Sequence, residues 1–181
     1  APLAATLLLG ASLALFGQTY QTGADTYELF LYWALLALPW VLIGRHPALW
    51  LLWIGLLNLR LELYSQFFDR FWWILLPKQQ GFLALFWLNL LALGLWEFAA
   101  WRGVTWLQGR WAPRILGTAA GSLVTTAQIW WFVDHPLGRL LEIVPLMYVL
   151  WVIGMYFFYR FRRLDLFMLA GLSLSLILVG T

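Results

Sequence analysis

The sequence predicts an all-α fold, a bundle of about seven helices that cross a membrane. Hydrophobic residues make up 64% of the chain and charged residues only 10%, whereas a soluble domain carries about 25% charged residues. Apolar runs of nearly spanning length recur along the whole chain, and 14 Trp and 7 Tyr accompany them. Trp and Tyr favour the interface between membrane and water. A chain of this composition cannot cover itself with a water-compatible surface, so we expect its solvent to be a lipid bilayer.

Seven runs come close to the roughly 20 residues that a spanning helix needs. They cover residues 2–17, 28–44, 48–64, 81–99, 114–133, 143–159 and 164–180. Pro39 lies inside the second run, where neighbouring helices of a bundle can satisfy the freed carbonyl. No repeat or long linker divides the chain, so residues 1–181 are expected to form a single transmembrane domain. Because the chain starts inside an apolar run and without Met, we expect it to be part of a longer protein.

Two connections are rich in aromatic residues. The stretch 65–78 contains Phe67, Phe68 and Trp72 beside Asp69. It is interpreted either as a continuation of the third helix or as an interfacial helix ended by Pro77, and we favour the continuation. The stretch 101–114 is expected to lie in the headgroup layer.

The distribution of basic residues predicts the topology. With seven spans, one side of the membrane holds seven of them: Arg45, Arg102, Arg110, Arg114, Arg160, Arg162 and Arg163. The other side holds four: Arg60, Arg70, Lys78 and Arg139. Cytoplasmic loops carry the excess of Lys and Arg. We therefore expect a multi-pass protein of a bacterial inner membrane, with the stretch from Gln18 to Glu28 on the periplasmic side.

That stretch is the longest polar run between two apolar segments, and it contains no basic residue. Polar residues also recur within helices, where they are costly and face the bundle interior, a cavity or an interface. Asn58, Glu62 and Ser65 share one stripe of the third helix. On the fifth helix Gly117 and Gly121 form a GxxxG pattern, which lets another helix approach closely.

We hypothesise that polar groups converge in an outward-facing cavity that binds a ligand. The candidate residues are Gln18, Tyr20, Gln21, Asp25, Asn58, Glu62, Gln128 and Asp134. The alternative is a set of solvated helix ends together with ordinary helix packing through Gly117 and Gly121. On the inner side, Arg160, Arg162 and Arg163 are predicted to anchor a helix end to anionic lipid headgroups.

Catalysis has little support in the sequence. The chain contains no Cys, which excludes disulfides and thiolate ligands. His46 and His135 lie on opposite predicted sides, so they cannot share a metal ion. We expect no catalytic residue, no cofactor, no metal and no nucleic acid partner, and the chain is predicted not to be an enzyme.

The segment from Gly17 to Asp25, GQTYQTGAD, is followed by Trp33-Ala34 and Leu38-Pro39. It resembles the recurring Gly-Gln-x-Tyr-Gln-x-Gly-Ala-Asp segment of a bacterial family of predicted membrane proteins, domain of unknown function 2157. The resemblance is specific from Gly17 to about Tyr64. It implies a membrane protein and brings no activity, and it singles out Gln18, Tyr20, Gln21, Gly23 and Asp25.

These observations favour a non-catalytic structural or accessory subunit of a larger membrane complex, with the bilayer and other membrane subunits as partners. The alternative is a transporter or a protein that binds a small ligand or lipid in the outward-facing polar cavity. A lipid-modifying enzyme would need an interfacial pair such as Asp134-His135.

Overall fold

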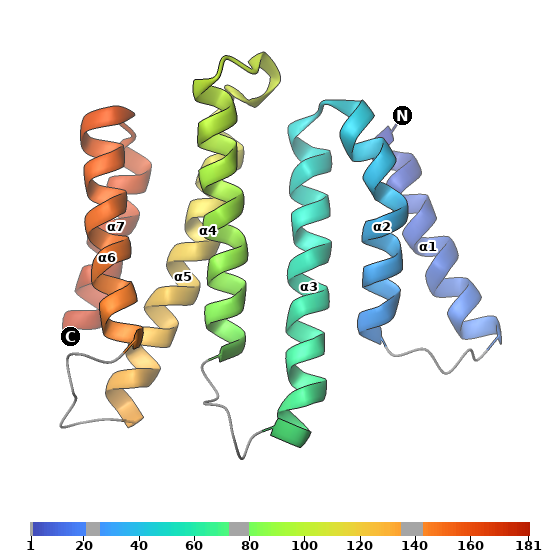
Figure 1. The fold of residues 1–181 in the computed structure, drawn as a ribbon, viewed down its shortest axis with the longest axis horizontal. Coiled ribbons are helices and arrows are strands. Elements are labelled where there is room, and N and C mark those ends of the chain that lie inside the picture. The colour runs from blue at the N-terminus through green and yellow to red at the C-terminus, as the bar shows by residue number, and fades with distance from the viewer. Residues whose placement is uncertain (1, 21–25, 73–79, 135–142) are drawn as a thin grey trace. The chain divides into compact units, whose positions relative to one another are not determined.

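The computed structural model describes residues 2–20, 26–72, 80–134 and 143–181. These residues form helices and no strand, which confirms the all-α prediction (Figure 1). The seven α-helices are α1 (Pro2–Tyr20), α2 (Thr26–Gly44), α3 (Pro47–Trp72), α4 (Gln80–Trp101), α5 (Trp111–Asp134), α6 (Ile143–Phe157) and α7 (Leu166–Gly180). A short 3-10 helix, η1 (Thr105–Leu107), precedes α5, and a π-helical turn, η2 (Phe158–Arg162), extends α6.

Three helical stretches of the described chain are long and apolar enough to cross a membrane, namely Tyr27–Gly44, Gly81–Trp101 and Ile143–Arg162. Pro2–Gln18 and Leu166–Gly180 are apolar but shorter. α3 and α5 are long enough, but Asn58, Arg60 and Glu62 in α3 and the Gly, Thr and Ser residues of α5 make them more polar.

The helix ends differ from the predicted ones in an informative way. α1 continues to Tyr20, so Gln18 belongs to a helix rather than to the polar connection. α3 continues to Trp72, as the favoured interpretation of that stretch predicts. α7 begins at Leu166 because Asp165 caps it, and the Asp165 side chain accepts a hydrogen bond from the Phe167 N–H. Such a side-chain acceptor satisfies one of the free N–H groups at a helix start.

The chain forms two compact units, which we describe separately. The first unit consists of residues 1–81 and 95–112, and the second of residues 82–94 and 113–181. In the first unit α1, α2 and α3 pack side by side around small residues such as Ala34 and Ala37, which are buried. The Trp33 indole N–H donates to the Thr6 carbonyl at 2.8 Å, and the Trp53 indole N–H donates to the Ala34 carbonyl at 3.0 Å.

The segment 95–112 packs against the start of α3. The rings of Trp50 and Trp106 stack with centroids 6.3 Å apart, and the Trp96 indole N–H donates to the Leu107 carbonyl at 3.1 Å. Arg110 forms an ion pair with the buried Glu97 at 3.5 Å. Arg45, Arg102 and Arg110 therefore lie at one end of the first unit.

In the second unit α5 and α7 run parallel to each other, and α6 runs antiparallel to both. Arg114 near the start of α5 contacts Asp165 at the start of α7, and eleven residues further on Thr125 contacts Ser175. The two helices thus stay in register over about three turns. α6 crosses the same helices from the opposite end and brings Tyr148 to Ser175.

Candidate functional site

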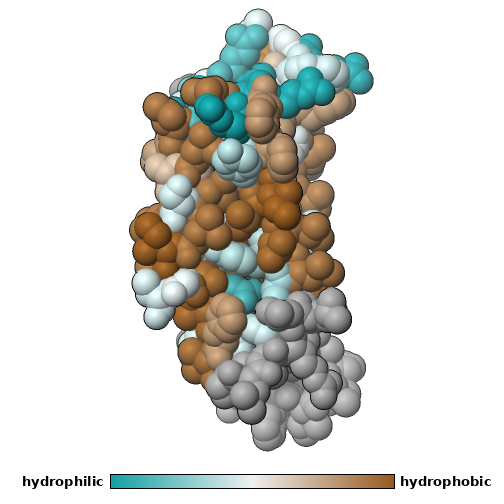
Figure 2. Space-filling view, turned by 90° about the vertical axis from the view of Figure 1, so that its left-hand side faces the viewer, coloured by the Kyte–Doolittle hydropathy of each residue, from teal (hydrophilic) through white to brown (hydrophobic). Residues whose placement is uncertain are grey.

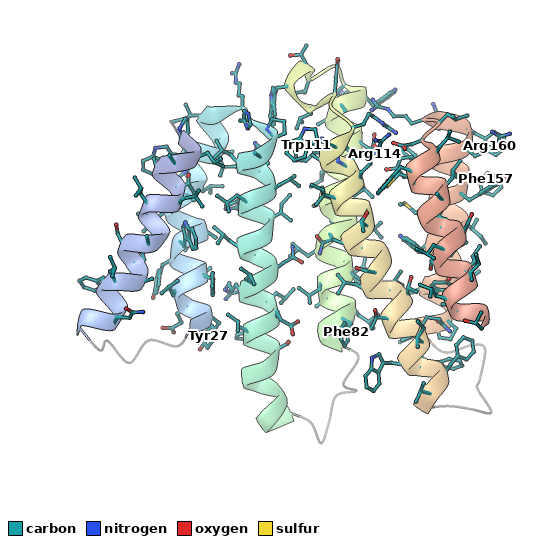
Figure 3. The ribbon with its side chains drawn as sticks, turned by 180° about the vertical axis from the view of Figure 1, so that it is seen from behind. Tyr27, Phe82, Trp111, Arg114, Phe157 and Arg160 are labelled. Atoms are coloured by element: carbon teal, nitrogen blue, oxygen red, sulfur yellow. The ribbon has the colours of Figure 1, made fainter. Side chains whose placement is uncertain are left out.

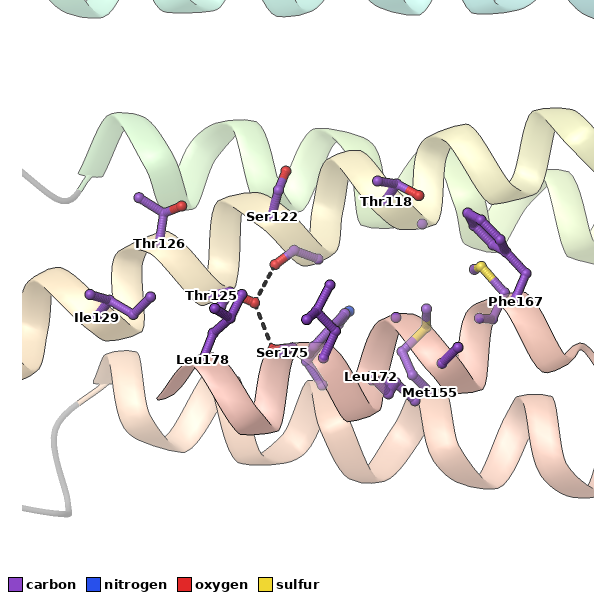
Figure 4. A pocket seen from close by; sticks show the side chains of 17 residues that line it. Thr118, Ser122, Thr125, Thr126, Ile129, Met155, Phe167, Leu172, Ser175 and Leu178 are labelled. Carbon is purple, nitrogen blue, oxygen red and sulfur yellow. Dashed lines mark hydrogen bonds between the residues drawn. The ribbon is translucent and has the colours of Figure 1, made fainter. Parts of the chain in front are cut away.

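A cavity of about 500 Å³ opens between α5, α6 and α7 of the second unit (Figure 4). Small-molecule sites typically have volumes of about 300–1,000 Å³. Its lining is mostly apolar, with hydroxyl groups along α5, and includes Gly117, Thr118, Gly121, Ser122, Thr125, Thr126, Ile129, Trp151, Met155, Phe167, Met168, Gly171, Leu172, Ser175 and Leu178. Such a surface suits an apolar molecule.

The cavity exists because α5 presents small residues to its neighbours. A Cβ atom at Gly117 would overlap the Met168 side chain, and one at Gly121 would lie 3.2 Å from Trp151 Cζ2. Glycines at these positions therefore admit large side chains of α6 and α7. The adjacent small residues Thr118 and Ser122 are exposed, and they leave the space between the helices unfilled.

A chain of hydroxyl groups lies beside the cavity (Figure 4). The Thr125 hydroxyl donates to the Gly121 carbonyl at 2.6 Å and lies 2.7 Å from the Ser175 hydroxyl. The Tyr148 hydroxyl lies 2.9 Å from the Ser175 hydroxyl. Because a carbonyl can only accept, Ser175 donates to Thr125 and Tyr148 donates to Ser175. The chain thus links α6, α7 and α5 in a fixed direction.

One polar atom of a residue in the cavity wall finds no hydrogen-bond partner within the described part of the chain. Trp151 is 7% exposed, and its indole N–H has no acceptor among the described residues. A buried donor without an acceptor is costly.

The α5 and α7 starts form a charged mouth at one end of the cavity. Arg114 donates from Nε and Nη2 to the two Asp165 carboxylate oxygens, each at 3.2 Å. Asp165 is buried, whereas the Arg114 side chain is 43% exposed. The guanidinium also lies 5.5 Å from the ring centroid of Phe167, which lines the cavity.

Further arginines lie at the same end of the second unit. Figure 3 shows Arg114 and Arg160 at one end and Phe82 at the other. The π-helical turn carries Arg160 and Arg162 in exposed positions. In Figure 2, which faces the α6–α7 side, apolar residues occupy the middle of the surface and hydrophilic residues gather at one end. This pattern matches a membrane-spanning surface with a hydrophilic edge.

The described residues predicted to form a polar cavity belong to both units: Gln18, Asn58 and Glu62 to the first and Gln128 to the second. Gln18 is exposed on α1, and the Asn58 amide donates to the Ile54 carbonyl of its own helix at 2.8 Å. Glu62 is partly buried on α3 and its carbonyl accepts from Ser65. Gln128 belongs to the second unit and is 2% exposed, and its Oε1 accepts no hydrogen bond from any described residue. Gln21 and Asp25 lie outside the described residues, as do the side chains of Tyr20 and Asp134.

Sequence reasoning singled out Gly117 and Gly121 but missed most of the other residues that line this cavity, and it did not pair Arg114 with Asp165. Tyr148 and Ser175 lie in helices that are otherwise apolar, and Ser175 is one of several serines with no distinguishing spacing. Asp165 gave a usable signal, because an Asp directly before an apolar run is typical of a helix start. Its partner Arg114 lies 51 residues away, and no local pattern pairs them.

Residues 1–50 match the profile of a family described as predicted membrane protein (DUF2157). The predicted similarity to this family is thus confirmed over residues 1–50. No curated protein matches the chain. No solved structure matches it either. Similarity to a membrane protein family and the apolar helices of the structure together indicate a lipid bilayer environment.

Proposed function

We propose that this multi-pass membrane protein binds a hydrophobic ligand, the acyl chain of a lipid, in the cavity between α5, α6 and α7. The role is binding rather than catalysis. The observation that carries the proposal is the cavity itself, with its mostly apolar wall. We favour this cavity over the predicted outward-facing polar cavity because its lining residues all come from one compact unit. The polar cavity stays a prediction.

We further propose that all seven helices cross a bacterial inner membrane. The positive-inside rule supports a cytoplasmic location for Arg45, Arg102 and Arg110 in the first unit and for Arg160 and Arg162 in the second. The polar stretch from Gln18 to Glu28 follows the opposite end of α1 and is then periplasmic.

The proposal is tested by filling the cavity. A Cβ at Gly171, which lines the cavity, would meet no atom within 4 Å. Gly171→Leu therefore adds a large side chain at the cavity wall at a position where its Cβ meets no atom. Gly154 is a matched control, because it is exposed on α6, does not line the cavity and is equally free of neighbours.

Binding of a spin-labelled stearic acid to the purified protein in detergent is measured by electron paramagnetic resonance. We expect an immobilised component in the wild type and in Gly154→Leu, and a loss of affinity of about tenfold or more in Gly171→Leu. Equal binding by all three proteins would contradict the proposal.

A second candidate function is that of a structural or accessory subunit. It is favoured by α2, because only 17% of its span Tyr27–Gly44 is buried within the chain. Another membrane protein could cover this face, on which Leu35, Leu42 and Ile43 are exposed. Extraction in a mild detergent followed by mass analysis tests it. A stoichiometric membrane partner would support this function, and a protein that elutes with lipid alone would contradict it.

A further inference from the structure

The cavity of the second unit is elongated and has two chemically different ends. Its lining on α5 extends from Gly117 to Ile129, a helical rise of roughly 18 Å. Phe167 and Met168 line it close to Arg114, and Leu178 lines it thirteen residues after Asp165. An occupant therefore has a long apolar part that runs along α5 and α7.

The end near Arg114 is strongly basic. Arg114 lies beside the cavity through its contact with the lining residue Phe167. Arg160 lies at the same end of the second unit (Figure 3), and Arg162 and Arg163 follow it in the chain. Asp165 is the only acidic residue in the described stretch 143–181. Two guanidinium nitrogens of Arg114 already bind its carboxylate. Arg160 and Arg162 are exposed, so their charge is available to an anion outside the chain.

We infer that the cavity selects an anionic phospholipid. One acyl chain lies along α5 and α7, and the phosphate faces the arginines at the basic end. An anionic headgroup is complementary in charge to the arginines at this end. An uncharged apolar molecule would make no electrostatic interaction with them.

This inference rests on the proposed binding function and adds the class of ligand. Exposed basic residues near a membrane surface attract anionic lipid headgroups. Removal of two arginines at the basic end should therefore abolish headgroup selection and leave the apolar cavity unchanged.

The test uses bilayer nanodiscs with equal amounts of phosphatidylglycerol and phosphatidylcholine that carry the same acyl chains. The protein is released into detergent, and retained lipid is identified by native mass spectrometry. We expect about one lipid per chain in the wild type, with phosphatidylglycerol enriched about tenfold. In R160Q/R162Q we expect the same amount of lipid with a ratio near one.

The control variant R45Q/R102Q removes two exposed arginines of the first unit. It should retain the preference of the wild type, which separates a local site from a general effect of net charge. Loss of preference in this control to the same extent as in R160Q/R162Q would overturn the inference.

The remaining outcomes separate the two proposals. Retained lipid without headgroup preference in the wild type would overturn the anionic selection and leave the binding function standing. No retained lipid, or lipid retained equally by Gly171→Leu, would overturn both. A co-released protein in place of lipid would show that a partner helix fills the cavity, and this too would overturn the inference.

Discussion

Glycines lie at helix interfaces in both units, but the interface is closed in the first unit and leaves a cavity in the second. In the first unit the ring of Trp33 on α2 lies directly against Gly10 of α1, and its indole N–H is held by the Thr6 carbonyl. In the second unit Gly117 and Gly121 receive Met168 and Trp151, but a cavity remains beside them. A helical glycine thus only permits close approach. The side chains opposite it decide whether the interface closes or stays open.

Hydrogen bonding differs between the units in the same way. In the first unit indole N–H groups of Trp33, Trp53 and Trp96 donate to backbone carbonyls of other elements. In the second unit hydroxyl side chains bond to one another across three helices. The first pattern fixes large rings in place. The second fixes small residues and leaves room for a ligand.

The largest effect is expected at the charged mouth of the second unit. Asp165→Ala removes a helix cap, which contributes about 0.5–2 kcal/mol, and two charge-assisted hydrogen bonds to Arg114. The Arg114 side chain is 43% exposed, so water weakens these two hydrogen bonds. We therefore expect a total loss of about 3 kcal/mol in the free energy of unfolding. Denaturation in detergent followed by circular dichroism measures it.

Asp165→Asn is the matched control, since Asn caps helices as well as Asp does. It should lose about half as much free energy. A double-mutant cycle with Arg114→Gln isolates the energy of the Arg114–Asp165 ion pair. A coupling energy of zero would show that the pair does not stabilise the fold.

The tight contact of the first unit should give the next largest effect. Gly10→Ala places a methyl group on the rigid Trp33 ring, and overpacking of this kind costs about 1–3 kcal/mol. Gly17→Ala in the same helix meets nothing within 4 Å and should be neutral or stabilising. The midpoints of thermal unfolding are compared between the two variants. Equal midpoints would contradict the tight contact between Gly10 of α1 and Trp33 of α2.

A smaller loss is expected from the hydroxyl chain. Ser175→Ala removes the residue that joins Tyr148 to Thr125, and interhelical hydrogen bonds in membranes contribute about 0.6 kcal/mol on average. We expect a loss of about 1 kcal/mol in unfolding free energy. Ser173→Ala is the control, because Ser173 is exposed and its hydroxyl donates only to Leu169 of its own helix. If Ser173→Ala lost as much unfolding free energy as Ser175→Ala, the chain of hydroxyl groups would contribute nothing specific to stability.

The smallest effect on stability is expected at the cavity. Gly171→Leu relieves the entropic cost of a helical glycine, which is about 0.5–1 kcal/mol, and its side chain enters open space. We expect a gain of about 0.5 kcal/mol, measured by thermal unfolding. A large loss would mean that the space at Gly171 is closed in the folded protein.

The helices could be predicted from the sequence because each is a long apolar run, and the bilayer leaves few alternatives to a helix for such a run. The locations and hydrogen-bond partners of most polar residues could not be predicted from the sequence. Gln18 was assigned to a connection but lies in α1, because a helix that leaves the membrane can continue with polar residues. Ser175 gained a role only through Tyr148 and Thr125, which are 27 and 50 residues away. Pairing at such separations depends on the register of α5, α6 and α7, which no local pattern encodes.

The most direct test of the central claim compares lipid contacts of the two units in a bilayer. A phosphatidylglycerol with a photoreactive diazirine in its acyl chain is crosslinked to the protein, and the modified residues are mapped by mass spectrometry. The account predicts concentrated labelling of cavity residues such as Ser122 and Gly171, well above that of the exposed Leu42 and Ile43 of α2. Labelling spread evenly over the exposed apolar residues of both units would contradict it.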